Sequence, residues 1–153
     1  MRAQDLMTMS PACVTADEPV RRVAQLMAEH DCGCIPVVDA SDNRRVVGVI
    51  TDRDIAVRGT AQGKGPDTSV RELMTPDPQC CLPDDELQAV ERVMADQQVR
   101  RVIIVDDDGY CVGIVAQADL ARAAEKTNDV TDRDLARVVE RISQPAPATA
   151  SPR

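Results

Sequence analysis

The tetrapeptide Thr-Asp-Arg-Asp occurs twice in the chain, at Thr51–Asp54 and at Thr131–Asp134. The first copy directly follows the apolar run VVGVI, so a strand would deliver Thr51 to the start of a helix. A helix start has unpaired backbone N–H groups and the positive end of the helix dipole, and it can therefore hold a phosphate. Thr51 could donate its hydroxyl group to that phosphate, and Arg53 could add positive charge. Asp54 could accept hydrogen bonds from two neighbouring hydroxyl groups, as on a ribose.

The same residues also fit a purely structural role as a helix cap. The hydroxyl group of Thr51 and the carboxylate of Asp54, three residues later, form a relative of the capping box, and such a cap is worth about 1 kcal/mol. From these residues alone the cap is favoured over the ligand site, and both interpretations stay open. The second copy follows TNDV, which is not a strand pattern, so we interpret Thr131 and Asp134 as a helix start only.

The composition excludes several classes of partner. The formal net charge is −8, and the chain has no Trp, no Phe and one Tyr. Proteins that bind a phosphate backbone need a basic face, and single-strand binders use aromatic stacking platforms, so we expect no nucleic-acid partner. The sequence has no apolar window of about 18 residues, and its N-terminus lacks the apolar core of a signal peptide. We therefore expect no membrane partner and a cytoplasmic location.

The chain contains an internal repeat. DLMT at Asp5–Thr8 returns as ELMT at Glu72–Thr75, 67 residues later. Further along, Val47–Gly48 is matched by Val112–Gly113, after two residues have dropped out of the intervening loop. Agreement along the chain with one short gap indicates a duplicated structural unit.

Each repeat is predicted to run strand–helix–strand–strand–helix, which places the chain in the α/β (α+β) fold class. The segments ACVTA and QCCLP are predicted to be the short first strands. The further predicted helices and strands cover residues 18–31, 34–39, 45–50, 85–98, 101–107 and 110–115, and the second helices are predicted to begin within 51–59 and 116–124. The predicted organisation is a first repeat at 5–60, a linker at 61–71, a second repeat at 72–124, an amphipathic helix at 128–143 and a disordered tail at 144–153.

Three of the predicted helices show an apolar face at helical spacing. The face of the helix at 85–98 is expected to hold Leu87, Val90, Val93 and Met94. The face of the helix at 18–31 is expected to hold Val20, Val23, Ala24, Met27 and Ala28. The face of the C-terminal helix, expected to pack on the core or on a partner, would hold Val130, Leu135, Val138, Val139 and Ile142.

The two repeats differ at the start of their second helix. The second repeat keeps Asp119 where the first has Asp54, but Ala116 stands in place of Thr51. A pure cap could lose its hydroxyl group here at small cost, and so could a weak ligand site. Two unequal sites are therefore expected under either interpretation.

The cysteine and histidine residues give little support for catalysis or metal binding. His30, the only His, is close to Cys32 and Cys34, but no second His or C-x2-C pair completes a zinc site. With one His no catalytic triad can be assembled, and no P-loop is present. Cys13 and Cys80 occupy equivalent positions on predicted buried strands, where free cysteine packs as a small hydrophobe. Redox or metal chemistry at Cys32 and Cys34 stays open as an alternative.

The ordered double set of motifs resembles paired cystathionine-β-synthase (CBS) domains of the short stand-alone bacterial type. The resemblance is carried by LMT at the start of each repeat, by IPVVD and VIIVD, and by VGVITDRDI and VGIVAQADL. It covers about Asp5 to Ala124. The resemblance implies two repeats packed about a pseudo-twofold axis into one module, with two clefts between them. It also implies that modules pair into homodimers.

In such families the clefts bind adenosine-containing ligands such as AMP, ADP, ATP, NAD(H) or S-adenosylmethionine, as regulatory ligands and not as required cofactors. The family motif falls on GVITDRD, with Thr51 at the phosphate and Asp54 at the ribose, and this raises the ligand interpretation above the cap. The first cleft is implied to consist of Thr15, Cys34, Ile35, Pro36, Thr51, Arg53 and Asp54. The second, weaker cleft is implied to consist of Leu82, Arg101, Val102, Ile103 and Asp119, with Ala116 and Ile103 replacing the Thr and the Pro of the first.

We therefore expect a non-enzymatic regulatory module that binds an adenine nucleotide and signals to an effector protein through a conformational or dimer change. Two alternatives remain from other classes. One is a redox-responsive or metal-responsive protein that uses His30, Cys32 and Cys34, and the other is a dimerisation scaffold whose clefts stay empty.

Overall fold

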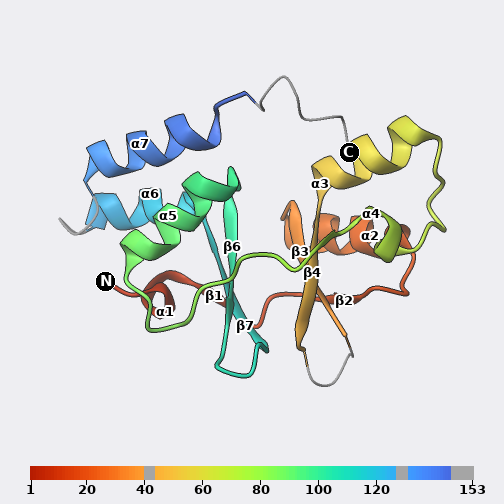
Figure 1. The fold of residues 1–153 in the computed structure, drawn as a ribbon, viewed down its shortest axis with the longest axis horizontal. Helices are drawn as coiled ribbons and strands as arrows, with labels where there is room; N and C mark the ends of the chain where they lie inside the picture. Colours follow the sequence, from red (N-terminus) through yellow and green to blue (C-terminus); the bar gives the residue numbers. More distant parts are fainter. Residues whose placement is uncertain (40–43, 127–130, 146–153) are drawn as a thin grey trace. The chain divides into compact units, whose positions relative to one another are not determined.

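Each repeat is built around a hairpin of apolar strands, as the runs of Val and Ile predict. The computed structural model describes residues 1–39, 44–126 and 131–145. In the first repeat, β3 (Cys34–Val38) pairs antiparallel with β4 (Val46–Thr51). In the second, β6 (Arg101–Val105) lies next to β7 (Cys111–Ala116) (Figure 1). All five residues of β3 are buried, which explains why this strand is apolar throughout and does not alternate.

The first helix of each repeat ends in the same way. Both α2 (Val20–His30) and α5 (Leu87–Gln97) are followed by a residue in the left-handed conformation, Asp31 at φ 48° and Gln98 at φ 54°. Their N–H groups bond back to the last helical turn, as in a helix C-cap. On α2 the buried side chains are Val20, Val23 and Leu26.

The apolar face predicted for α2 was therefore partly wrong. Ala24 and Ala28 are exposed, and Leu26 is buried in their place. The buried stripe consists of Val20, Val23 and Leu26, which follow one another at a spacing of three residues. The small alanines lie outside this stripe.

The opening strand of each repeat pairs with the hairpin of the other repeat. One sheet has the order β1-β7-β6 and the other the order β2-β3-β4-β5. Thus β1 (Thr8–Met9), from the start of the chain, lies against β7, whereas β5 (Thr75–Pro76), from the start of the second repeat, lies against β4. The remaining strand, β2 (Val14–Thr15), runs parallel to β3.

Because of this exchange, each compact unit of the structure combines segments from both repeats. One unit, here called the first-repeat unit, consists of Ser10–Pro78 and Asp106–Val112. The other, the second-repeat unit, consists of Met1–Met9, Gln79–Val105 and the chain from Gly113 onward.

The turn of the second hairpin is held within the first-repeat unit. The N–H group of Val46 donates to Gly109 O at 3.0 Å. The guanidinium of Arg45 lies 5.5 Å from the ring centroid of Tyr110, the one aromatic residue of the chain. This is the geometry of a cation–π contact.

The segment predicted to be a linker is tied to the first-repeat unit at its C-terminal end. The first N–H groups of α2, from Val20 and Arg21, donate to Thr68 O at 2.8 Å and to Pro66 O at 3.0 Å. The short helix α4 (Val70–Leu73) begins inside the predicted linker. Its two end residues are fully buried, so this stretch stabilises the unit as well as connecting the repeats.

The same arrangement recurs at the chain's start, where α1 (Ala3–Leu6) meets the segment before α5. The N–H group of Ala3 donates to Asp85 O at 2.9 Å, and that of Leu87 donates to Met1 O at 3.1 Å. The predicted duplication therefore extends to the hydrogen bonds that cap the helices.

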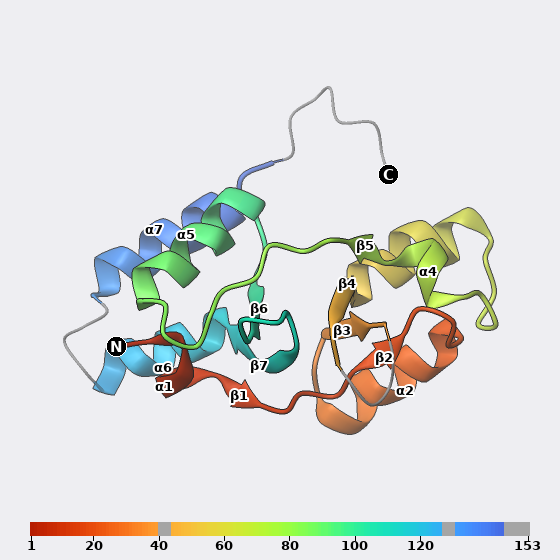
Figure 2. The ribbon, with the colours of Figure 1, turned by 60° about the horizontal axis from the view of Figure 1, so that its bottom comes forward.

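The C-terminal helix packs on the second-repeat unit. After α6 (Gln117–Lys126), α7 (Asp132–Ile142) lies alongside α5 in both views (Figures 1 and 2). Of the predicted apolar face, Val138 is buried and Val139 is 39 % exposed. Val130 and the predicted tail from residue 146 lie outside the described residues. Among the helices described, none has the length and apolar character needed to cross a membrane.

Candidate functional site

Thr51 is both the last residue of β4 and the N-cap of the helix that follows, α3 (Asp52–Asp54). Its hydroxyl oxygen accepts a hydrogen bond from the backbone N–H of Asp54 at 3.2 Å. In return, the carboxylate of Asp54 accepts from the backbone N–H of Thr51 at 3.0 Å. The predicted capping box is thus confirmed at the end of a sheet strand.

The carboxylate of Asp54 also has a cationic partner that the sequence analysis did not single out. Arg58 Nε lies 3.8 Å from Asp54 Oδ1, and the two side chains are 24 % and 15 % exposed. Arg58 Nη1 donates to the backbone carbonyls of Leu73 at 3.2 Å and Met74 at 3.0 Å. The i,i+4 spacing of Asp54 and Arg58 was the signal that could have found this pair.

The helical segment then widens before it ends. A π-helical turn, η1 (Ile55–Gly59), follows α3 and is followed in turn by the 3-10 helix η2 (Thr60–Gln62). Short π-helical turns inside helices are frequent at functional sites. Arg58, which bonds the end of α4, lies within this turn.

Cys34 is brought next to Thr51. The two residues face each other directly across the β3–β4 ladder, as do Ile35 and Ile50. Residues opposite each other in an antiparallel pair project to the same side of the sheet. Cys34, Ile35 and Pro36 are all buried, so they give the start of β3 an apolar character beside the polar residues of the helix start.

The end of β4, the start of α3 and the start of β3 meet at one place, here called the corner. Gly33, which precedes β3, is also part of it. The N–H group of Asp52 donates to Gly33 O at 3.0 Å. A Cβ atom at position 33 would lie 2.7 Å from Asp52 Oδ2. A side chain at this position would therefore force Asp52 to move.

The structure does not bring Thr15 to this corner within the first-repeat unit. Thr15 pairs with Val38, at the opposite end of β3 from Cys34. Its N–H group donates to Glu18 Oε2 at 2.6 Å, just before α2. Arg53 is exposed at the surface.

The equivalent corner of the second-repeat unit has half of the capping box. The carboxylate of Asp119 accepts from the backbone N–H of Ala116 at 2.7 Å and pairs with Arg122. Asp119 is 8 % exposed, and Ala116 offers no hydroxyl group in return. The predicted inequality of the two corners is confirmed at the level of the cap.

Most of the other residues named for the second corner lie in β6, whose start is tied to this corner. The N–H group of Gln117, at the start of α6, donates to Arg100 O at 2.9 Å. Arg101 opens β6 and is half-buried, and Val102 and Ile103 are buried in the same strand. Leu82 is 39 % exposed, and its N–H group donates to Asp85 Oδ2 at 2.8 Å. Leu82 and Asp85 thus repeat the bond that Thr15 makes with Glu18.

The second Thr-Asp-Arg-Asp is a helix start, as predicted. Thr131 is the N-cap of α7, and its hydroxyl oxygen accepts from the backbone N–H of Asp134 at 3.2 Å. Hydrogen bonds from the side chain and the backbone of Thr131 lower the pKa of Asp134. Both copies of the tetrapeptide therefore make the same cap, and the copy at Thr51 makes it at the end of the sheet strand β4. The residues directly before Thr131 lie outside the described part of the chain.

The histidine and cysteine residues do not form a metal site in the part of the chain that the structure describes, where no three His, Cys, Asp or Glu side chains converge on one point. His30 is exposed at the end of α2. The prediction that Cys13 and Cys80 lie on buried strands was wrong, because both are half-buried and outside the strands. At the second of these places Cys81 is the buried residue, and it bridges to Ile104.

Comparison with known proteins identifies the family. Residues 3–58 and residues 70–126 each match the family model of the CBS domain. The chain belongs to the CBS domain family. The two matches correspond to the two repeats, so the protein is a CBS tandem.

Two curated relatives are similar over most of their length. The CBS domain-containing protein YhcV of Bacillus subtilis is 41 % identical over 118 residues, 77 % of this chain and 81 % of the relative. Hypoxic response protein 1 of Mycobacterium tuberculosis is 37 % identical over 121 residues, 78 % of this chain and 82 % of the relative. Both alignments therefore cover most of the CBS tandem.

Solved structures agree on the fold. A crystal structure of Hypoxic Response Protein I, with two coordinated zinc ions, has a TM-score of 0.72 at 36 % identity, and the match covers 80 % of this chain and 98 % of that one. The CBS domain pair of protein MJ0100, in complex with 5′-methylthioadenosine and S-adenosyl-L-methionine, has a TM-score of 0.74 at 26 % identity, covering 82 % and 97 %. CBSX2 in complex with AMP has a TM-score of 0.71 at 28 % identity, covering 82 % and 96 %. These similarities confirm the predicted family and fold class.

Proposed function

We propose that this CBS tandem is a regulatory module that binds an adenosine-containing ligand at the Thr51–Asp54 corner of the first-repeat unit. The observation that carries the proposal is the half-buried cap at the end of β4, where a hydroxyl group and a carboxylate face each other across one helical turn. Two solved CBS proteins of similar fold hold ligands with an adenosine group, namely AMP in one and S-adenosyl-L-methionine with 5′-methylthioadenosine in the other.

Each part of the corner suits one part of such a ligand. The carboxylate of Asp54 can accept hydrogen bonds from two vicinal ribose hydroxyl groups, and Thr51 can donate to a phosphate or another polar group. The buried residues at the start of β3 offer an apolar surface for the base. A ligand would replace the mutual bonds of Thr51 and Asp54 with bonds to itself, so the cap fills the role of the ligand when the site is empty.

The charges at the corner favour ligands with few phosphates. Asp52 adds a carboxylate at the helix start. Arg53 of the same tetrapeptide is exposed, whereas Arg58 is already paired with Asp54. The whole chain carries a formal net charge of −8. We expect AMP or S-adenosylmethionine to bind more tightly than ATP, because like charges repel a triphosphate.

The output of the module would be a change in a partner or in the protein's own assembly. A ligand shifts an equilibrium between two arrangements only by its difference in affinity for them. Arg58 provides a direct connection, because it joins Asp54 to the carbonyls of Leu73 and Met74, just before β5. We propose a homodimer as the responding species and regulation, not catalysis, as its role.

Calorimetric titration with AMP, ADP, ATP, NADH and S-adenosylmethionine tests the proposal. A hydrogen bond to a charged group is worth about 1.5–3 kcal/mol, so Asp54→Ala is expected to weaken binding roughly tenfold to a hundredfold. The matched control is Asp134→Ala, which removes the same cap carboxylate from α7 and is expected to leave affinity unchanged. Equal losses of affinity from both substitutions would contradict the proposal that Asp54 lies in the ligand site. Binding of none of the five compounds would favour a ligand-independent scaffold.

A further inference from the structure

Two cysteines and an arginine from distant parts of the sequence meet in the first-repeat unit. A hydrogen bond joins the side chains of Cys13 and Cys111, and the Cys13 thiol itself donates to Pro11 O at 3.4 Å. Arg44 Nη2 lies 3.4 Å from Cys13 Sγ and donates to Pro11 O at 2.8 Å. The backbone carbonyl of Arg44 accepts from the N–H group of Cys111 at 2.8 Å. Arg44 therefore contacts both cysteines, one through its side chain and the other through its backbone.

Arg44 has two unusual features at this place. Its φ angle is 56°, in the left-handed region that side-chain-bearing residues seldom adopt. Among the buried side-chain nitrogens and oxygens that the structure describes, its Nε atom has no hydrogen-bond partner. The positive charge of Arg44 next to the sulfur atom acts to lower the pKa of Cys13, against the larger opposite effects of the hydrogen bond with Cys111 and of burial.

The two thiols differ in access. Cys13 is half-buried, whereas Cys111 is 4 % exposed. A small reagent can therefore reach Cys13 first, and Cys111 lies behind it as a second thiol within hydrogen-bond distance. Elsewhere in the chain, Cys81 is buried beside Asp85, and burial together with that negative charge raises its pKa to about 11.

We propose that Cys13 and Cys111 form a redox-active dithiol that exchanges with low-molecular-weight disulfides to give an intramolecular disulfide. The Cys13 thiolate attacks one sulfur of the small disulfide, that S–S bond breaks, and the released thiolate takes up the proton that Cys13 lost. Cys111 then loses its proton and attacks Cys13 Sγ in the mixed disulfide, and the second small thiolate leaves with that proton. Two cysteine thiols are oxidised and one small disulfide is reduced to two thiols.

The surroundings also set the pH dependence of this exchange. The hydrogen bond with Cys111 and then burial raise the pKa of Cys13, while the charge of Arg44 lowers it. Because the net effect is a rise and the thiolate is the reacting species, the exchange is expected to accelerate with pH into the alkaline range. Arg44 acts as a positioning residue, and Arg44→Gln is expected to slow the exchange at a given pH and to shift the rate profile to higher pH.

Incubation of the full chain with oxidised glutathione, followed by intact mass and peptide mapping, tests the proposal without any nucleotide and so independently of the proposed function. The unsubstituted chain is expected to lose two hydrogens and to yield a linked peptide pair containing Cys13 and Cys111. Cys111→Ser is expected to stop at a stable glutathione adduct on Cys13, and Cys13→Ser is expected to react at neither position. Circular dichroism checks that both variants fold.

The matched control is Cys32→Ser, which replaces another half-buried cysteine of the same unit. It is expected to leave the linkage and its rate unchanged. A linkage between other cysteines, or a folded unsubstituted chain that forms no Cys13–Cys111 link under these conditions, would overturn the proposal.

Discussion

Met74 lies against Gly48 so closely that a Cβ atom at position 48 would come within 2.8 Å of Met74 Sδ. The equivalent pair in the second-repeat unit is Met7 and Gly113, where the same distance would be 2.5 Å. In each pair the methionine comes from the LMT motif of one repeat and the glycine from the VG motif of the other. The two motifs recur because each needs the other across the exchanged strands.

Substitution of Gly48 tests this contact. Gly48→Ala is expected to lower the free energy of unfolding by about 1–3 kcal/mol, because the new methyl group overpacks the site. It would meet Thr75 O at 3.0 Å as well as the methionine. Gly65→Ala is the control, since a Cβ atom there has no neighbour within 4 Å. Chemical denaturation of both variants gives the comparison, and equal stability would show that β5 is not held in this way.

Substitution of the two threonine N-caps distinguishes an effect on stability from an effect on ligand binding. Thr51→Ala and Thr131→Ala each remove a hydroxyl group that accepts from the N–H three residues later. Each is expected to cost about 1 kcal/mol of stability, as other N-cap substitutions do. Only Thr51→Ala is expected to lower the affinity for the ligand that binds most tightly in the calorimetric titration. A matching loss of affinity in Thr131→Ala would mean that binding follows general stability and not the corner at β4.

The incomplete cap of the second-repeat unit can be completed by one substitution. Ala116→Thr places a hydroxyl group where Asp119 N–H can donate to it, while Asp119 already accepts from the N–H of residue 116. The free energy of unfolding is expected to rise by about 0.5–1 kcal/mol. Thermal unfolding measures the change, and destabilisation would show that the half-buried position cannot hold the larger side chain.

Arg58 is expected to contribute to stability although it is charged and on a short helix. Arg58→Met removes the ion pair with Asp54 and the hydrogen bonds to two backbone carbonyls. The expected loss is about 1–3 kcal/mol, because those carbonyls lose their side-chain donor. Arg53→Met, at an exposed position of the same segment, is the control and should stay within about 0.5 kcal/mol of the unsubstituted chain. Urea titration distinguishes the two.

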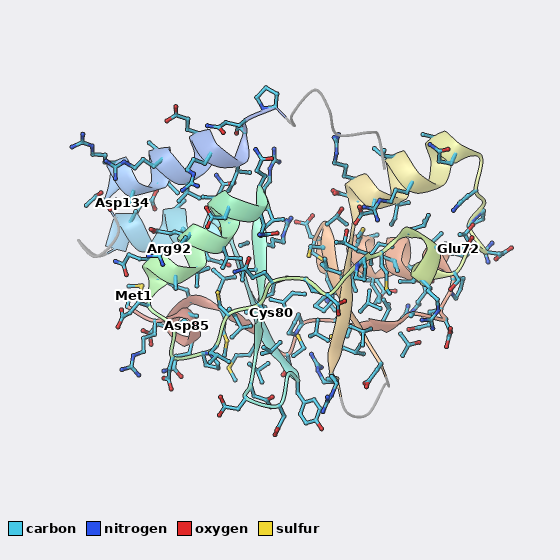
Figure 3. All side chains as sticks on the ribbon, in the orientation of Figure 1. Met1, Glu72, Cys80, Asp85, Arg92 and Asp134 are labelled. Carbon is cyan, nitrogen blue, oxygen red and sulfur yellow. The ribbon has the colours of Figure 1, made fainter. Side chains whose placement is uncertain are left out.

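The stability of the second-repeat unit is expected to depend on pH because of Glu91. It lines the groove between α5 and α7 together with Arg92, Arg137, Arg141 and Asp134, of which Figure 3 labels Arg92 and Asp134. Burial and then the charge of Asp134 raise the pKa of Glu91. An acid whose pKa is raised by folding contributes stability below its ordinary pKa, and this contribution is lost as the pH rises through the folded-state value.

Removal of the Glu91 carboxylate is therefore expected to stabilise the protein at neutral pH. Glu91→Gln is expected to raise the thermal midpoint at pH 7 relative to the unsubstituted chain, and the gain should vanish at pH 4 and below. Glu125→Gln, an exposed carboxylate on α6, serves as the control and should change neither midpoint. A gain for Glu91→Gln that is the same at both pH values would contradict the electrostatic explanation.

The features that the sequence predicted well are local or repeated ones. The period of the apolar residues placed α2 and α5, and the runs of Val and Ile placed the two hairpins, because burial acts on each segment separately. The segments that precede the two tetrapeptides then separated Thr51 from Thr131, since only the first follows an apolar strand pattern in the sequence. Comparison of the two repeats showed in advance that Ala116 would leave a weaker cap.

The features that the sequence did not predict depend on pairs of distant residues. The strands β1 and β5 have two residues each, too few for any period to show, and their partners are in the other repeat. The contact between Cys13 and Cys111 likewise depends on a chain path that spacing does not encode. The glycines and polar residues at 61–71 predict a linker, although backbone carbonyls near its end accept from the first N–H groups of α2 and its last residues begin helix α4.

The exchange of opening strands bears on how a chain of this kind can arise by duplication. A molecule with a single repeat would carry a segment that fits a neighbour's hairpin and would leave the edge of its own hairpin open. Two such molecules would complete each other by trading these segments, as in a domain-swapped dimer. Fusion of two copies in one gene would then keep these contacts and make the strand exchange intramolecular. On this view the modern chain is a reciprocal dimer held together by its own backbone.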